Sequence, residues 1–258
     1  QFNSSNYNGN YIYFGIREHA MAAVMNGIAL HGGLRPYGGT FLVFTDYCRP
    51  SIRLSALMGL STIYVMTHDS IGLGEDGPTH QPVEQLSGLR DIPNLQVFRP
   101  ADTTETLECW ELALESSNSP SIMALTRQKL NPIRKEFVRE NKCSKGAYEV
   151  FRNNKTIELT IFATGSEVNL AIDVSHKLAT QNIYSKVVSV PCQELFEKQT
   201  NEYKRKILDE TTYKISIEAA TTNNWKKFVG EKGLSFGIDN FGKSAPYKDI
   251  YNFFGLTV

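Results

Sequence analysis

The 258 residues are 41% hydrophobic and 21% charged, a composition typical of a soluble globular chain of one or two domains. Basic and acidic residues balance at 27 each, so no charge excess favours a nucleic acid or a membrane surface, and no apolar run approaches the ~20 residues of a membrane span. Four scattered cysteines predict free thiols in a reducing, cytoplasmic setting: Cys48, Cys109, Cys143 and Cys192. The chain opens on Gln1 rather than Met, from which we expect that an upstream part is missing.

Strand-like and helix-like segments alternate through the first 130 residues, after a polar lead-in over residues 1–10. The patterns predict strands at residues 11–14, 39–45, 62–66, 96–99 and 121–125, and helices at residues 17–31, 51–60, 83–89 and 103–116. In the last helix, Asp102 and Glu105 resemble a capping box, and Leu107, Trp110 and Leu114 predict the buried stripe. The alternation favours an α/β domain with a parallel sheet.

The stretch from Thr67 to Pro82, THDSIGLGEDGPTHQP, follows a buried strand and concentrates glycines, acids and two histidines. Loops at the carboxyl ends of strands are where open α/β sheets bind ligands. Its G-x-G-x-x-G pattern (Gly72, Gly74, Gly77) does not favour a dinucleotide site, because two prolines delay the helix that such a site requires. Taken alone, the loop is as compatible with a solvated Ω-loop as with a binding site.

Several other candidates also have ordinary structural interpretations. Glu18 lies in the first turn of a predicted helix, where an acid stabilises the helix dipole. Phe41, Phe44 and Tyr47 are aromatic residues of the kind usually found in a core, and Phe41 and Phe44 can converge only if the strand ends or bends between them. Arg127 follows the strand at residues 121–125, where a lone arginine is usually a solvated charge.

The second half repeats the alternation after a basic, irregular linker at residues 131–146. Strands are predicted at residues 147–151, 157–163, 186–190 and 214–218, with an amphipathic helix at residues 166–181 that buries Val168, Ala171, Ile172 and Leu178. The turn that precedes this helix, residues 164–166, fits an anion site or an ordinary serine N-cap equally well. We therefore predict two α/β domains, residues 1–130 and 147–258, the second smaller and with a mixed sheet.

Several long motifs, in order, resemble the transketolase family. They are GIREHAMAAVMNGIAL (15–30), PYGGTFLVFTDYCRPSIRLSALMG (36–59), THDSIGLGEDGPTHQP (67–82), VFRPAD (97–102), SIMALTRQ (121–128), ATGSEV (163–168) and FGIDNFG (236–242). The resemblance implies a pyrimidine-binding domain that lacks its first strand and helix, followed by the family's C-terminal domain. It also implies transfer of a two-carbon ketol unit between sugar phosphates in the pentose phosphate pathway.

The resemblance further implies that thiamine diphosphate supplies the chemistry that side chains cannot. Glu18 would face N1′ of the cofactor's aminopyrimidine, within a pocket formed by Phe41, Phe44 and Tyr47, and burial there should raise the pKa of its carboxyl. The family binds the diphosphate and Mg²⁺ (or Ca²⁺) through an N-terminal domain with a GDG…N signature, which is absent here. No metal ligand is therefore expected in this chain.

By the same resemblance, His80 and Asp76 meet the reacting carbons of the sugar, and His80 exchanges protons there. His68 and Arg127 would contact the substrate phosphate. The expected partners are the N-terminal domain, a second subunit in a homodimer and sugar phosphates, without nucleic acid or membrane. Alone, the chain is expected to be inactive. A phosphosugar-binding module without catalysis and an assembly fragment that dimerises through the second domain stay open as alternatives.

Overall fold

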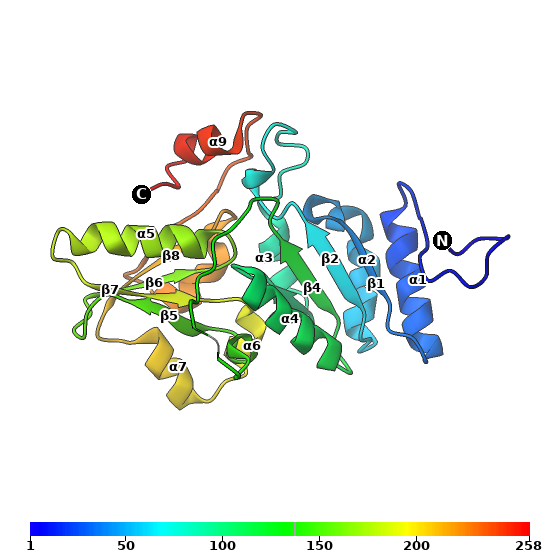
Figure 1. The fold of residues 1–258 in the computed structure, drawn as a ribbon, viewed down its shortest axis with the longest axis horizontal. Coiled ribbons are helices and arrows are strands. Elements are labelled where there is room, and N and C mark those ends of the chain that lie inside the picture. Colours follow the sequence, from blue (N-terminus) through cyan, green and yellow to red (C-terminus); the bar gives the residue numbers. More distant parts are fainter. Residues whose placement is uncertain (137) are drawn as a thin grey trace.

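The structure is a computed structural model that describes residues 1–136 and 138–258, and it contains two sheets, each with helices packed on it (Figure 1). The first sheet has four parallel strands in the order β1-β2-β4-β3. Their bounds are β1 Tyr37–Phe41, β2 Ile63–Thr67, β3 Gln96–Phe98 and β4 Ser121–Leu125. The predicted parallel sheet is confirmed.

Four helices pack on this sheet: α1 Glu18–His31, α2 Thr45–Leu57, α3 Gln85–Arg90 and α4 Thr103–Glu115. Successive strand residues point to opposite faces, so each strand serves two cores. Tyr64 and Ile122 pack among apolar side chains of α1, α2 and α3. Their neighbours Ile63 and Met123 pack on the other face, where α4 contributes Cys109 and Ala113.

The second sheet has five strands in the order β5-β7-β6-β8-β9, with β5 antiparallel to β7 and the other pairs parallel. This confirms the predicted mixed sheet. The strands are β5 Tyr148–Arg152, β6 Leu159–Ala163, β7 Ser185–Ser189, β8 Tyr213–Ile217 and β9 Leu234–Phe236. The helices are α5 Glu167–Ala179, α6 Gln193–Glu197, α7 Asn201–Leu208, α8 Lys226–Val229 and α9 Tyr247–Phe253. Of the residues predicted to be buried in α5, Val168 and Ala171 are fully buried, whereas Ile172 and Leu178 are partly buried.

The segment between β4 and β5 runs along α4. The backbone N–H of Ile133 donates to Asp102 Oδ2 at 3.0 Å, and that of Cys143 donates to Glu108 Oε2 at 3.0 Å. A short 3-10 turn, η3 (Lys142–Lys145), precedes β5. Residue 137 of the predicted linker lies outside the described residues.

Three local predictions for the first half are wrong. The segment at residues 11–14 forms no strand. The predicted strand at residues 39–45 is β1 followed by a 3-10 turn, η1 (Leu42–Phe44), and α2 begins at Thr45 with Pro50 inside it, rather than at Ser51.

Among the described residues, no helix has the length and apolar character that a membrane crossing requires.

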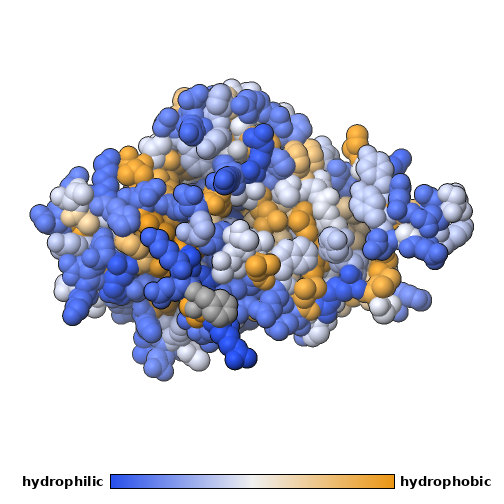
Figure 2. Space-filling model, in the orientation of Figure 1, coloured by the Kyte–Doolittle hydropathy of each residue, from blue (hydrophilic) through white to orange (hydrophobic). Residues whose placement is uncertain are grey.

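The predicted buried stripe of α4 is wrong for two of its three members, since only Trp110 packs, partly buried, against the core. Leu107 and Leu114 are 67% and 53% exposed, and in Figure 2 apolar side chains reach the surface where Figure 1 places α4. The fully buried side chains of α4 lie on a different face of the helix and are Glu105, Cys109 and Ala113. A hydrophobic pattern cannot show this face, because one of its members is a carboxylate and the other two are small.

Candidate active site

Three neighbouring strands of the first sheet end at one edge, and each places a candidate residue there. Phe41 is the last residue of β1, His68 follows the last residue of β2, and Arg127 lies two residues beyond β4. The register pairs Phe41 with Thr67 and Thr67 with Leu125, so these three ends are level. The carboxyl edge of a parallel sheet is where such folds bind ligands.

The end of β1 at Phe41 brings aromatic side chains together that a continuous strand would separate. The rings of Phe41 and Phe44 stack with centroids 5.9 Å apart and an interplanar angle of 4°. His68 stacks on Phe41 at 3.7 Å, and His80 meets Phe44 edge-on at 5.5 Å. Tyr47 packs against Phe44 at 5.8 Å and is 66% exposed. We call these five side chains the aromatic row.

The charged candidates Asp76 and Arg127 lie within electrostatic reach of His68. Burial, and then the positive charge of Arg127, lower the pKa of His68, while the charge of Asp76 opposes the shift. His68 Nδ1 is 2.8 Å from Thr67 Oγ1, and its backbone has a φ of +60°. That conformation is uncommon for a residue other than glycine, costs about 1–3 kcal/mol and persists only where the surrounding structure fixes it. The surroundings of His68 therefore hold its backbone in the conformation in which its ring stacks on Phe41.

Glu18 is the first residue of α1, which packs along α2. Burial, and then the charge of Glu18, raise the pKa of the Cys48 thiol to about 12, so the carboxylate lies near the residue that follows Tyr47. Glu18 itself is half-buried. The enclosure of Glu18 by Phe41, Phe44 and Tyr47 stays a prediction.

The glycine-rich loop, residues 68–82, forms a compact turn rather than the start of a helix. A 3-10 turn, η2 (Ile71–Leu73), is capped by Ser70, whose hydroxyl accepts the N–H of Gly72 at 3.1 Å. Gly74 and Gly77 have φ values of +93° and +80°, and α3 starts only at Gln85. The rejection of a dinucleotide fingerprint agrees with this geometry.

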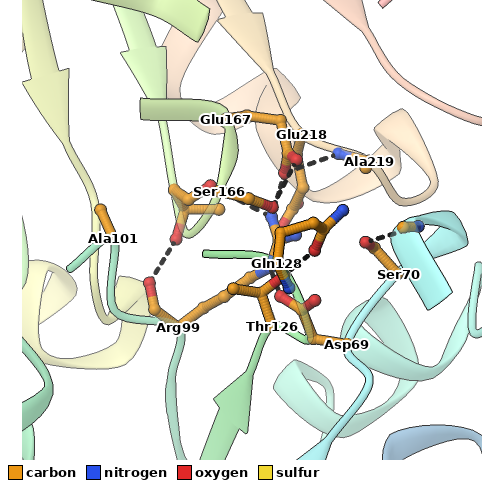
Figure 3. Close-up of polar contacts among 12 residues, drawn as sticks. Asp69, Ser70, Arg99, Ala101, Thr126, Gln128, Ser166, Glu167, Glu218 and Ala219 are labelled. Atoms are coloured by element: carbon orange, nitrogen blue, oxygen red, sulfur yellow. Dashed lines mark hydrogen bonds and ion pairs between the residues drawn. The ribbon is translucent and has the colours of Figure 1, made fainter. Parts of the chain in front are cut away.

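A buried charge cluster next to the loop was missed by the sequence reasoning (Figure 3). Arg99 donates to Asp69 Oδ2 at 2.8 Å, to Glu167 Oε2 at 2.6 Å and to the carbonyl of Thr164 at 3.1 Å. Glu218 Oε1 lies 3.5 Å from Arg99 and 2.8 Å from Arg90. The motif VFRPAD contained Arg99, but its partners lie 30 to 119 positions away, so no local pattern could reveal them.

The turn before α5 belongs to this cluster. Ser166 makes no capping hydrogen bond, and its hydroxyl donates to Glu167 Oε1 at 2.7 Å. Thr164 and Glu167 instead face Arg99. In the described part of the chain, no group of three or more His, Cys, Asp or Glu side chains is arranged to hold a metal ion.

Comparison with known families decides what this architecture is. Residues 1–132 match the family described as "Transketolase, pyrimidine binding domain", and residues 146–257 match "Transketolase-like TK C-terminal domain". This chain belongs to the transketolase family. We use "C-terminal domain" below for residues 146–257.

Individual transketolases are similar over nearly the whole chain. The transketolase of Sinorhizobium medicae is 55% identical over 98% of this chain and 36% of its own length. The structure of the Leishmania mexicana transketolase has a TM-score of 0.93 at 44% identity, covering 99% of this chain and 37% of that one. A Pichia stipitis transketolase in complex with sedoheptulose-7-phosphate has a TM-score of 0.91 at 45% identity, covering 98% and 36%. The chain spans 36–39% of the length of its curated relatives.

The residues of this transketolase chain suit one part of thiamine diphosphate. A flat heteroaromatic ring is stabilised by stacking on side chains such as the paired rings of Phe41 and Phe44. Glu18, the first residue of α1, supplies a carboxylate. The chain thus offers groups that suit the aminopyrimidine end of the cofactor.

Proposed function

We propose that this chain forms one wall of a thiamine-diphosphate-dependent transketolase site and takes part in transferring a two-carbon ketol unit between sugar phosphates. The aromatic row is the main support for this proposal. The rings of Phe41 and Phe44 stack at one sheet edge, with His68 against Phe41 and His80 against Phe44. Membership of the transketolase family and the similarity to a transketolase bound to sedoheptulose-7-phosphate support the assignment.

When bound, thiamine diphosphate would supply the electron sink for breaking and forming the carbon–carbon bond. Phe41, Phe44 and Tyr47 would hold its aminopyrimidine ring by stacking and edge contacts. Glu18 would share a proton with N1′ of that ring. Because the cofactor and a neighbouring subunit would cover Glu18, its carboxyl would become more buried than it is in the isolated chain.

The substrate groups would be divided between the two ends of the aromatic row. Arg127 and His68 lie beyond the ends of β4 and β2, where a planar guanidinium and an imidazole can bind a phosphate. Asp76 and His80 lie on the glycine-rich loop. His80, which contacts Phe44, would donate a proton to oxygen at the reacting carbons and take it back.

The wider setting is part of the proposal. The relatives are much longer than this chain, and the part of the enzyme that corresponds to their additional length would hold the diphosphate and Mg²⁺. A second subunit would complete the site in a homodimer. All four cysteines are free and buried, which suits a reducing compartment, and we place the enzyme in the cytoplasm and in the pentose phosphate pathway.

A chimera tests the function directly. Residues 1–258 would replace the matching segment of the relative that is 55% identical. We expect ketol transfer from a ketose phosphate to an aldose phosphate, and loss of about 10²–10⁴-fold in kcat for His80→Ala. A chimera that dimerises and binds cofactor and sugar phosphate without any transfer would contradict the proposal and favour a module that only binds.

A further inference from the structure

We propose that the C-terminal domain is a positioning element for the glycine-rich loop, and that Gln81 is the main positioning residue. The inference rests on the proposed function, because it concerns how that loop presents Asp76 and His80. Three separate sets of contacts join the loop to the C-terminal domain: one at each end of the loop and one along its apolar face. α9 lies beside η2 at the top of Figure 1.

The first end of the loop is fixed through Asp69. This side chain is 1% exposed and bonds to Arg99, which in turn binds Glu167 and the carbonyl of Thr164, both in the C-terminal domain (Figure 3). Because Asp69 directly follows His68, the cluster fixes the backbone next to the φ of +60°. The orientation of His68 toward Phe41 thus depends on residues of the other domain.

The last end is fixed through the carboxamide of Gln81, which is 3% exposed. Its Nε2 donates to the carbonyl of Gly74 at 2.7 Å, inside the loop, and to the carbonyl of Lys243 at 2.9 Å, in the C-terminal domain. A single amide group thus closes the loop on itself and joins it to the other domain. Its Oε1 is buried without a hydrogen-bond partner among the described residues.

The C-terminal domain is shaped to receive this carboxamide. A Cβ at Gly242 would lie 1.7 Å from Gln81 Oε1, so only glycine leaves room for the side chain. Two residues after Gly242, the hydroxyl of Ser244 donates to the carbonyl of Glu75, the residue before Asp76. The segment FGIDNFG at 236–242, which the proposed chemistry does not use, therefore ends at the residue that accommodates Gln81.

Apolar packing joins the domains between these two ends. Ile71, within the loop, and Val83, just after it, belong to the same buried cluster as Ile238 and Ile250 of the C-terminal domain. In contrast, Asp76 is exposed and His80 is half-buried. The loop is thus seated on the C-terminal domain on one side, whereas Asp76 stays exposed and His80 contacts Phe44.

The chimera described above tests this with Gln81→Met, which keeps the volume but removes both hydrogen bonds. The matched control is Gln193→Met, since Gln193 is 1% exposed and neither atom of its amide has a partner in the described structure. Gly242→Ala is a second variant that disturbs the same contact from the other domain. The readouts are amide hydrogen exchange of residues 72–80, cofactor affinity, and KM and kcat for the ketose phosphate.

We expect faster exchange at residues 72–80 in Gln81→Met and Gly242→Ala, with kcat/KM lowered about 10–100-fold through misplaced substrate contacts. Cofactor affinity in both variants should stay within about twofold of the parent, because the proposed cofactor residues lie outside the glycine-rich loop. Gln193→Met should match the parent in all readouts. A purely structural role of Gln81 would not lower kcat/KM while leaving cofactor affinity unchanged. Faster exchange with unchanged kcat/KM would overturn the positioning role. Unchanged amide exchange in Gln81→Met and Gly242→Ala would overturn the anchoring itself. Amide exchange can be measured even in a chimera that has no transferase activity, so a failure of the proposed function is distinguishable from a failure of the anchoring.

Discussion

Replacing Arg99 with methionine should destabilise the protein strongly, because the guanidinium is the centre of a buried charge cluster. Arg99 is fully buried, and its partners Asp69 and Glu167 are each 1% exposed. Glu218 retains Arg90, but Asp69 and Glu167 would lose their guanidinium partner. Removing one partner of a buried ion pair costs about 3–5 kcal/mol. For a chain of this length that is a fall in Tm of about 6–20 °C.

Thermal and urea unfolding of Arg99→Met against the parent measure this cost. Arg152→Met is the control, since the side chains of the Arg152–Glu149 pair are 38% and 36% exposed and such a pair should be worth about 1 kcal/mol or less. A loss of free energy of unfolding no larger than that of the control would refute the reasoning.

The same variant should show a defined pH dependence. Burial raises the pKa of Asp69 in spite of Arg99, and without Arg99 that pKa must rise further. A carboxyl with a raised pKa in the folded state favours folding below its unfolded pKa and loses that contribution as pH rises through the folded value. The stability deficit of Arg99→Met should therefore shrink from pH 8 to pH 5. A deficit that grows over this range would contradict the assignment.

Three further predictions concern the substrate and the cofactor. Arg127→Ala in the chimera should raise KM about 10–100-fold for phosphorylated acceptors and much less for unphosphorylated ones; equal effects would remove Arg127 from the phosphate site. Because burial and Arg127 lower the pKa of His68, that residue should gain its charge only below its ordinary pKa near 6.5. The ratio of the KM of His68→Gln to that of the parent for phosphorylated substrates should consequently rise as pH falls from about 8 to about 6, and a flat ratio would exclude charge from its role. Residues 1–258 produced alone should show no micromolar, Mg²⁺-dependent binding of thiamine diphosphate by calorimetry, and such binding would mean that the chain holds a complete site.

The aromatic row shows how far the sequence could lead. The family motifs picked out Phe41, Phe44 and Tyr47, and strand geometry stated the condition that Phe41 and Phe44 converge only if the strand ends between them. The structure meets that condition with a 3-10 turn directly after Phe41. The predicted helix starts six residues too late. Pro50 lies inside α2, where it has no N–H to donate to the helix.

The residues that join the two domains could not be predicted from local patterns. The predicted capping arrangement is present, since the N–H of Glu105 donates to Asp102 Oδ1 at 2.8 Å. The carboxylate of Glu105 is fully buried, however, and also accepts hydrogen bonds from Tyr148 at 2.7 Å and Ser189 at 2.6 Å, in the C-terminal domain. Gln81 carried no signal beyond its place in a motif. Such side chains owe their position to partners that are distant in sequence, which neither periodicity nor propensity reports.

The exchange of the C2 proton of thiamine diphosphate tests the central claim most directly, namely that Glu18, together with Phe41, Phe44 and Tyr47, forms the cofactor wall. Hydrogen–deuterium exchange at C2 would be measured in the chimera at saturating cofactor, for the parent and for Glu18→Gln. A glutamine amide has nearly the same shape but cannot share a proton with N1′, so we predict exchange slower by about 10²–10⁴-fold in a folded protein. An exchange rate within about threefold of the parent would contradict the account and leave Glu18 as an ordinary acid at a helix N-terminus.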